Sequence, residues 1–196
     1  MLKIAITGNI ASGKSQVEKI LEDLNYTVLD TDKINNDLLL NDEETKQEIK
    51  ETFKNYNIEE NNTISKTKLG DIVFNNKKEK EKLENILHKR ILEKIENYTK
   101  NNKNKDFIFI SVPLLFEVGW EKYFDKIVFV SADEKTRLER LIKRNNLTKE
   151  QAMARITAQD KEEYKIDKSD YVIYNNSDLT TLKLETNKFL SKIINL

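Results

Sequence analysis

The sequence predicts an α/β fold in which five strands form a parallel sheet flanked by helices. Three observations predict it: short apolar runs of strand length, helical spacing between them, and a glycine-containing loop after the first run. The strand-like runs cover residues 3–7, 27–31, 107–112, 126–130 and 171–174. Strands separated by helical segments favour parallel pairing with right-handed crossovers.

The first strand-like run leads into the octapeptide GNIASGKS, residues 8–15. It fits the pattern G-x-x-x-x-G-K-[ST] of a P-loop, in which backbone N–H groups and a helix N-terminus cradle phosphates. Apolar residues at the spacing of one helix face follow at once: Val17, Ile20, Leu21 and Leu24. A strand, this loop and an amphipathic helix in succession predict a nucleotide site.

The residue types inside this loop indicate how phosphates would be held. Gly8 and Gly13 allow the backbone to approach closely and to adopt unusual angles. Lys14 can reach the terminal phosphates, and the Ser15 hydroxyl can bind Mg²⁺.

The rest of the chain bears on the acceptor of the terminal phosphate. A guanine-nucleotide switch requires an N-K-x-D run and a D-x-x-G motif, and the sequence contains neither. A hydrolytic ATPase usually ends its third strand with an acidic residue, whereas residues 107–112 lead into PLLFE, residues 113–117. Transfer to water is therefore poorly supported.

The second strand-like run ends in Asp30-Thr31-Asp32. Carboxyl ends of neighbouring parallel strands open onto one crevice, and residues i and i+2 of a strand point to the same side. One carboxylate could then face a hydroxyl acceptor while the other orients Mg²⁺ or its waters. The alternative is that Asp32 caps the following helix, since Asp is a favoured N-cap residue.

Two helical insertions are expected between strands of the sheet. Residues 34–105 show helical spacing, for example at Leu83, Ile86, Leu87, Ile91 and Ile95, and Asn101–Asp106 reads as a return loop. The second insertion, 134–165, contains four of the five arginines, in a chain that otherwise uses lysine.

Three of these arginines, Arg137, Arg140 and Arg144, are spaced i, i+3 and i+7 on one helix face. A solvated face is the alternative, but lysine would serve that purpose equally well. The planar guanidinium binds phosphate in a bidentate way, so phosphate contact is favoured. Small-molecule kinases with a P-loop use a mobile lid that carries arginines to the transferring phosphoryl group.

Composition excludes several classes of protein. Lys+Arg and Asp+Glu are both 34, and zero formal charge gives no general attraction to nucleic acid or to anionic membranes. The absence of cysteine excludes disulfides, thiolate metal sites and a cysteine nucleophile. Strand-like residues begin at Leu2, and no apolar run approaches the roughly 18 residues of a membrane span. A cytoplasmic location is expected; the oligomeric state is not indicated.

In their order along the chain, GNIASGKS, LDTDKI (29–34), SVPLLFE (111–117), TRLERLIKRN (136–145) and QAMARITAQ (151–159) resemble the dephospho-coenzyme A kinase family. LENILHKRI (83–91) and DYVIYNNS (170–177) extend this resemblance over nearly the whole chain. The resemblance implies a P-loop kinase fold and ATP-dependent phosphorylation of the ribose 3′-hydroxyl of dephospho-coenzyme A, with Mg²⁺. Alternatives are another P-loop nucleoside, nucleotide or shikimate-type kinase, or a nucleotide-binding regulator without activity.

The resemblance also implies roles for individual residues. The residues implied in catalysis are Asp32, Lys14 and Arg140, with Asp32 as the base that accepts the hydroxyl proton. The residues implied in nucleotide binding are Gly8, Ala11, Ser12, Gly13, Lys14, Ser15, Gln16, Arg144 and Asn175, with Ser15 on the metal. The residues implied in substrate binding are Asp32, His88, Leu114, Glu117 and Arg155.

Three parts are implied as well. The nucleotide-binding core would comprise residues 1–33, 106–133 and 166–196, the substrate insertion 34–105 and the lid 134–165. The family usually has His-Pro where this chain has His88-Lys89, so the helix is expected to continue there. Asn9 and Ala11 stand where glycines are common, which costs the loop some backbone freedom.

Overall fold

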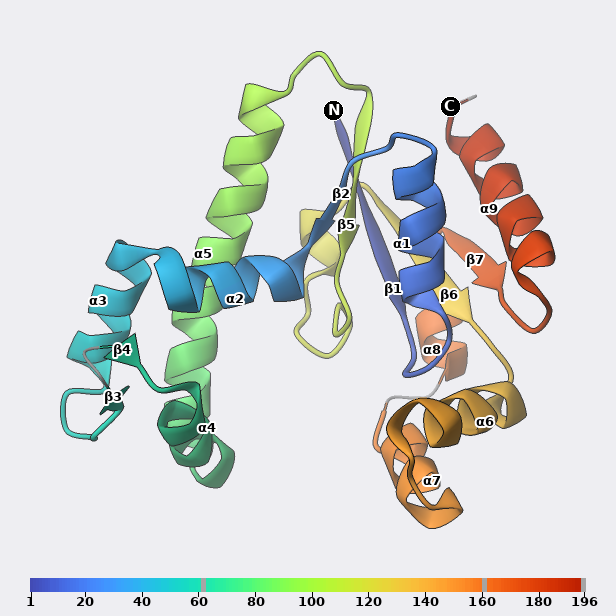
Figure 1. Cartoon of the computed structure of the whole chain (residues 1–196). Helices are drawn as coiled ribbons and strands as arrows, with labels where there is room; N and C mark the ends of the chain where they lie inside the picture. Colours follow the sequence, from blue (N-terminus) through green and yellow to red (C-terminus); the bar gives the residue numbers. More distant parts are fainter. Residues whose placement is uncertain (61–62, 160–161, 195–196) are drawn as a thin grey trace. The chain divides into compact units, whose positions relative to one another are not determined.

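The computed structural model describes residues 1–60, 63–159 and 162–194 (Figure 1). The chain forms two compact units, one comprising residues 1–29 and 104–196 and the other residues 30–103. A sheet of order β2-β5-β1-β6-β7 organises the first unit. Its strands are β1 (Leu2–Gly8), β2 (Val28–Asp30), β5 (Phe107–Ser111), β6 (Lys126–Ser131) and β7 (Tyr171–Tyr174).

Central strand β1 pairs in parallel with β5 on one side, where Ile4 lies opposite Phe109. On the other side it pairs in parallel with β6, where Ile6 lies opposite Val128, and β6 pairs in parallel with β7. All five predicted strands are present, and the predicted parallel α/β class is confirmed. Because the strands run in parallel, the loops after β1 and β6 leave the sheet at the same edge.

Among the described residues of the first unit, five helices are found. They are α1 (Lys14–Asp23), α6 (Glu134–Asn145), α7 (Lys149–Thr157), α8 (Glu162–Asp167) and α9 (Leu179–Ile194). A 3₁₀ turn, Glu121–Tyr123, precedes β6. α6 and α7 lie side by side as a helical pair, drawn in orange in Figure 1.

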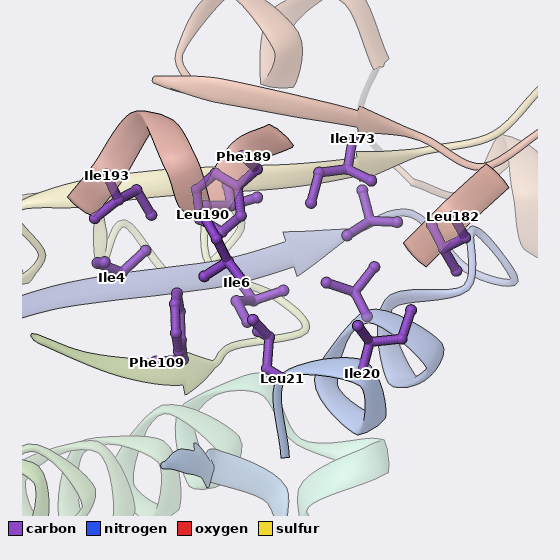
Figure 2. Close-up of a cluster of buried hydrophobic side chains, with 13 residues drawn as sticks. Ile4, Ile6, Ile20, Leu21, Phe109, Ile173, Leu182, Phe189, Leu190 and Ile193 are labelled. Atoms are coloured by element: carbon purple, nitrogen blue, oxygen red, sulfur yellow. The ribbon is translucent and has the colours of Figure 1, made fainter. Parts of the chain in front are cut away.

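One apolar cluster joins α1 and α9 to a single face of the sheet. Figure 2 shows Ile4 and Ile6 of β1 among Leu21 of α1, Phe109 of β5 and Phe189 of α9. Alternate residues of a strand share a face, so Ile4 and Ile6 point into this cluster together. The buried cluster fixes β1 and α1, the two elements that the P-loop connects.

The second unit is mainly helical. Its helices are α2 (Thr31–Asn41), α3 (Glu43–Thr52), α4 (Lys66–Asn75) and α5 (Lys77–Asn101). The apolar spacing read within residues 83–95 lies in α5, where Ile86, Leu87, Ile91 and Ile95 are buried. α5 continues through Lys89, as expected without a proline. A short antiparallel pair, β3 (Glu59–Glu60) and β4 (Thr63–Ile64), was not predicted because two-residue strands leave no periodicity to read.

The start of the second unit corrects one prediction. β2 ends at Asp30 and α2 begins at Thr31, so Asp30 and Asp32 are not two residues of one strand. Oδ1 of Asp30 accepts hydrogen bonds from the backbone N–H groups of Asp32 (2.9 Å) and Lys33 (3.3 Å). These bonds satisfy N–H groups that have no partner within the helix. Asp30, not Asp32, is therefore the helix cap.

Within the ranges described above, no helix has both the length and the apolar character needed to cross a membrane.

Candidate active site

The P-loop connects β1 to α1 through two backbone positions in the left-handed region. Gly13 has φ 97° and Ala11 has φ 61°. The turn is closed by a hydrogen bond from the N–H of Ser12 to the carbonyl of Asn9, 3.0 Å. The left-handed conformation costs an L-residue about 1–2 kcal/mol, so Ala11 is strained where a glycine would not be.

Both glycines of the loop are required by close contacts. A Cβ on Gly13 would lie 2.0 Å from Nδ2 of Asn175, and one on Gly8 would lie 2.6 Å from the carbonyl oxygen of Val130. Neither neighbour can move easily, since the first is a buried side chain and the second is backbone of β6, which is paired on both sides. The loop therefore excludes side chains at the two positions that its motif specifies.

Lys14 is held at the head of α1 by two side chains. Its Nζ donates to Oε1 of Glu18 and to Oγ of Ser111, each at 2.6 Å. Its side chain is only 16% exposed. Ser111 is the last residue of β5, so a neighbouring strand supports the lysine; neither Ser111 nor Glu18 was identified from the sequence. The available signals were the strand-end position of Ser111 and the i+4 spacing of Glu18.

Two further groups of the loop bear on phosphate and metal binding. Within the described part of the chain, Oγ of Ser12 is buried and has no hydrogen-bond partner, so it can donate to a phosphate oxygen. Ser15 and Gln16 are exposed in the first turn of α1. No group of three or more acidic, histidine or cysteine side chains suited to a metal occurs among the described residues. A hydroxyl ligand such as Ser15 fits Mg²⁺ held largely by nucleotide phosphates and water.

Arg140 and Asn175 meet the P-loop at the carbonyl of Ser12. Nδ2 of Asn175 donates to that oxygen at 2.8 Å, and Nη1 of Arg140 donates to it at 3.2 Å. Nη2 of Arg140 donates to the Asn175 carbonyl oxygen at 3.0 Å. Asn175 is 5% exposed and follows β7, where its N–H donates to the carbonyl of Ser131 at 2.8 Å. Three residues implied in nucleotide binding, Ser12, Gly13 and Asn175, are thus brought together with Arg140, which is implied in catalysis.

The other arginines of the helical pair have different surroundings. Arg137 is 6% exposed; its Nε donates to the Ala132 carbonyl at 3.0 Å and its Nη2 to Glu162 at 3.3 Å. Arg137 is therefore a buried structural residue, in contrast to the phosphate contact expected of it. Arg144 and Arg155 are exposed, and Arg144 donates to the side chain of its neighbour Asn145.

The residues predicted after β5 also differ from each other. Leu114 is 51% exposed. Glu117 accepts a hydrogen bond of 2.5 Å from Nζ of Lys165, whose side chain is 2% exposed. A buried ammonium requires a charged partner, so Glu117 neutralises Lys165. Any contact of Glu117 with a substrate would come in addition to this structural role.

Two predicted residues belong to the second unit. Asp32 is exposed in the first turn of α2. His88 is half-buried on α5, and burial lowers the pKa of its imidazole below the usual 6.5, while the charge of Glu84 acts in the opposite direction. Low pKa favours a neutral imidazole near neutral pH.

A P-loop with a supported lysine and a neighbouring arginine, on a parallel α/β sheet, is the arrangement of the P-loop nucleoside-triphosphate-binding proteins, which include small-molecule kinases. The family model described as dephospho-CoA kinase matches residues 2–181. The chain belongs to the dephospho-CoA kinase family.

Individual proteins agree with this assignment. The chain is 39% identical to a dephospho-CoA kinase of Fusobacterium nucleatum over 97% of both chains, and 37% identical to one of Helicobacter pylori over 97% of both. Among solved structures, dephospho-CoA kinase from Campylobacter jejuni is 31% identical, with a TM-score of 0.74 over 97% of this chain and 96% of that one. A shikimate kinase from Bacteroides thetaiotaomicron has a TM-score of 0.57 at 13% identity over 100% of this chain and 99% of that one, a likeness of fold alone.

Proposed function

We propose that this protein transfers the γ-phosphoryl group of ATP to the ribose 3′-hydroxyl of dephospho-coenzyme A, giving coenzyme A and ADP. In this step the hydroxyl oxygen forms a bond to the γ-phosphorus, and the bond from that phosphorus to the bridging oxygen of ADP breaks. The observation that carries the proposal is the convergence of Arg140 and Asn175 on the P-loop of a chain in this family.

The P-loop supplies the donor side of the proposed reaction. Its N–H groups and the N-terminus of α1 would hold the phosphates of ATP. The Nζ of Lys14, which forms hydrogen bonds to Glu18 and Ser111, would place its positive charge next to the terminal phosphates. Arg140 would stabilise charge on the transferring group, as arginines do in phosphoryl transfer. The family's use of ATP implies a divalent metal; we propose Mg²⁺ with Ser15 as its ligand, where it would neutralise phosphate charge.

The acceptor side of the proposal rests on Asp32. Asp30 is committed to capping α2 through two backbone hydrogen bonds. Asp32 is the neighbouring carboxylate that does not serve as the cap, and it is exposed. We assign to Asp32 the acceptance of the proton from the 3′-hydroxyl as the new bond forms.

Several finer assignments stay predictions. They are nucleotide contacts by Arg144, substrate contacts by His88, Leu114, Glu117 and Arg155, the three-part division with a lid at 134–165, the cytoplasmic location and the absence of a nucleic-acid partner.

The test is a panel of acceptors in a coupled assay of ADP release with Mg²⁺-ATP. The panel contains dephospho-coenzyme A, adenosine, AMP, shikimate and no acceptor. We expect strong turnover with dephospho-coenzyme A alone. Turnover with another acceptor would favour a different P-loop kinase, equal ADP release without acceptor would make water the acceptor, and no ADP release would favour a regulator.

A further inference from the structure

A residue far from the P-loop in sequence forms a hydrogen bond to the backbone of the loop, at a position that the P-loop motif leaves unspecified. The backbone N–H of Ile10 donates a hydrogen bond of 2.7 Å to Oε1 of Gln159, 149 positions further along the chain. The bond is partly buried, so water is a poor substitute for the side-chain amide. Gln159 lies just beyond α7, whose last residue is Thr157.

An apolar contact accompanies this hydrogen bond. Ile10 and Ala11 pack against a buried cluster formed by Leu141 of α6 with Ala152 and Ile156 of α7. The same two-residue stretch of the P-loop therefore makes polar and apolar contact with the α6–α7 pair. Neither contact involves the glycines or the lysine that define the motif.

The loop needs such support for a reason visible in its own backbone. Ala11 adopts the left-handed region at φ 61°, a conformation that a non-glycine residue does not favour on its own. Surrounding structure must hold a residue of this kind in place. Gln159 fixes the N–H that directly precedes Ala11, while Asn175 and Arg140 hold the carbonyl of Ser12 that follows it.

We infer that Gln159 is a positioning residue that keeps the P-loop in the shape that receives the phosphates of ATP. It acts through the backbone of Ile10, not by touching the nucleotide. Preformed loops bind more tightly because the ordering cost has already been met. The inference rests on the proposed use of this loop for ATP, but not on which acceptor takes the phosphate.

The test compares Gln159→Met with Gln151→Met. Methionine keeps the unbranched shape and removes the hydrogen-bond acceptor. Gln151 caps the other end of α7, where its Oε1 accepts from the N–H of Thr148 at 3.0 Å, so its loss weakens the helix without touching the P-loop. ATP affinity is measured by calorimetry without acceptor, and KM for each substrate is measured in the coupled assay.

We expect Gln159→Met to weaken ATP binding about tenfold, about 1.4 kcal/mol, while KM for dephospho-coenzyme A changes less than twofold. Gln151→Met should leave ATP affinity within about twofold of wild type. Unchanged ATP affinity in Gln159→Met, or equal weakening in both variants, would overturn the inference. ATP binding by a wild-type protein that phosphorylates none of the acceptors would refute the proposed function alone.

Hydrogen exchange on the unmodified chain keeps the inference testable if Gln159→Met does not fold. The Ile10 amide should exchange much more slowly than the amides of exposed loop residues, because its hydrogen bond to Gln159 must open first. Exchange at the rate of an exposed amide would overturn the inference.

Discussion

The phosphate end of the first unit and the helical second unit are stabilised in different ways. At the P-loop, the decisive hydrogen bonds join residues far apart in sequence, such as Asn175 to Ser12 and Gln159 to Ile10. In the second unit, side chains cap helices within two or three residues of themselves, as Asp30 and Asp42 do. The helix ends of the second unit are thus held by local caps, although Arg90 of α5 also bonds to Glu44 and Glu48 of α3. The groups around the P-loop, in contrast, come from distant parts of the first unit.

This difference predicts where substitutions will be felt. Changes at the phosphate end should alter turnover or nucleotide affinity, because they disturb groups aligned on the loop. Changes at caps of the second unit should alter stability and leave the chemistry intact. Asp32 breaks the division, since it lies in the second unit and is assigned a chemical role.

Replacing Arg140 should have the largest effect. Arg140→Lys should lower kcat on the order of 10³-fold, because an ammonium cannot stabilise the charge of the transferring phosphoryl group as a planar guanidinium does. Lysine also cannot bond to the Ser12 and Asn175 carbonyls with one planar group. Steady-state kinetics with both substrates saturating checks this, with Lys135→Ala, an exposed site on the same helix, as control. Near-normal turnover in Arg140→Lys would contradict the role given to this arginine.

The next effect is expected at Asp32. Asp32→Asn should lower kcat about 10²- to 10³-fold with little change in ATP affinity, because it removes a base but no contact with the nucleotide. Asp30→Asn is the matched control, since asparagine caps helices as well as aspartate does. If Asp32→Asn turned over like wild type while folded, the acceptor side would need another base.

A smaller effect, on stability alone, is expected at the cap of α3. Asp42 accepts from the N–H of Thr45 at 3.0 Å, and that backbone bond, aided by the Thr45 hydroxyl, lowers the pKa of its carboxyl to about 2. Asp42→Ala should lower the free energy of unfolding by about 1 kcal/mol, measured by urea denaturation at neutral pH.

The pH dependence of this cap has a definite sign. Because the folded pKa lies below the ordinary 3.8, the stabilisation is complete above about pH 4 and is lost as the pH falls towards 2. The difference between wild type and Asp42→Ala should shrink over that range. A constant difference would show that the carboxylate charge is not what stabilises the helix.

The smallest effect is expected at His88. Burial holds the pKa of its imidazole below 6.5, so protonation favours the unfolded chain and stability falls as the pH drops below that value. The opposing charge of Glu84 keeps this effect small. Urea denaturation at about pH 7.5 and about pH 5.5 should show a weaker pH dependence in His88→Gln than in wild type. An identical dependence would assign the titration to other groups.

Much of the fold could be predicted from local pattern. The five strands, the helix after the P-loop and the buried face of α5 all follow from apolar spacing. The boundary between β2 and α2 was misread because Asp30 caps the helix two residues earlier than the strand pattern suggested. The spacing of Arg137 and Arg140 on one helix could not reveal that one is buried against Glu162 and the other reaches the P-loop.

The residues of the candidate site likewise fall into those that could be predicted from local sequence and those that could not. The P-loop motif identified Gly13 and Lys14 because all the residues that define it are consecutive in the sequence. Ser111 and Gln159 were missed because their partners lie 97 and 149 positions away, and only the fold brings them together. Hydrogen bonds between residues so far apart leave no periodic pattern in the sequence, so they cannot be predicted from it.

The most direct test of the central claim is the position of the transferred phosphate. The product made from dephospho-coenzyme A and Mg²⁺-ATP would be purified and examined by phosphorus NMR coupled to the ribose protons. We predict a new phosphomonoester whose phosphorus couples to the proton on ribose carbon 3′, formed in equal amount with ADP. A phosphate on another hydroxyl, or ADP accompanied only by free phosphate, would contradict the account.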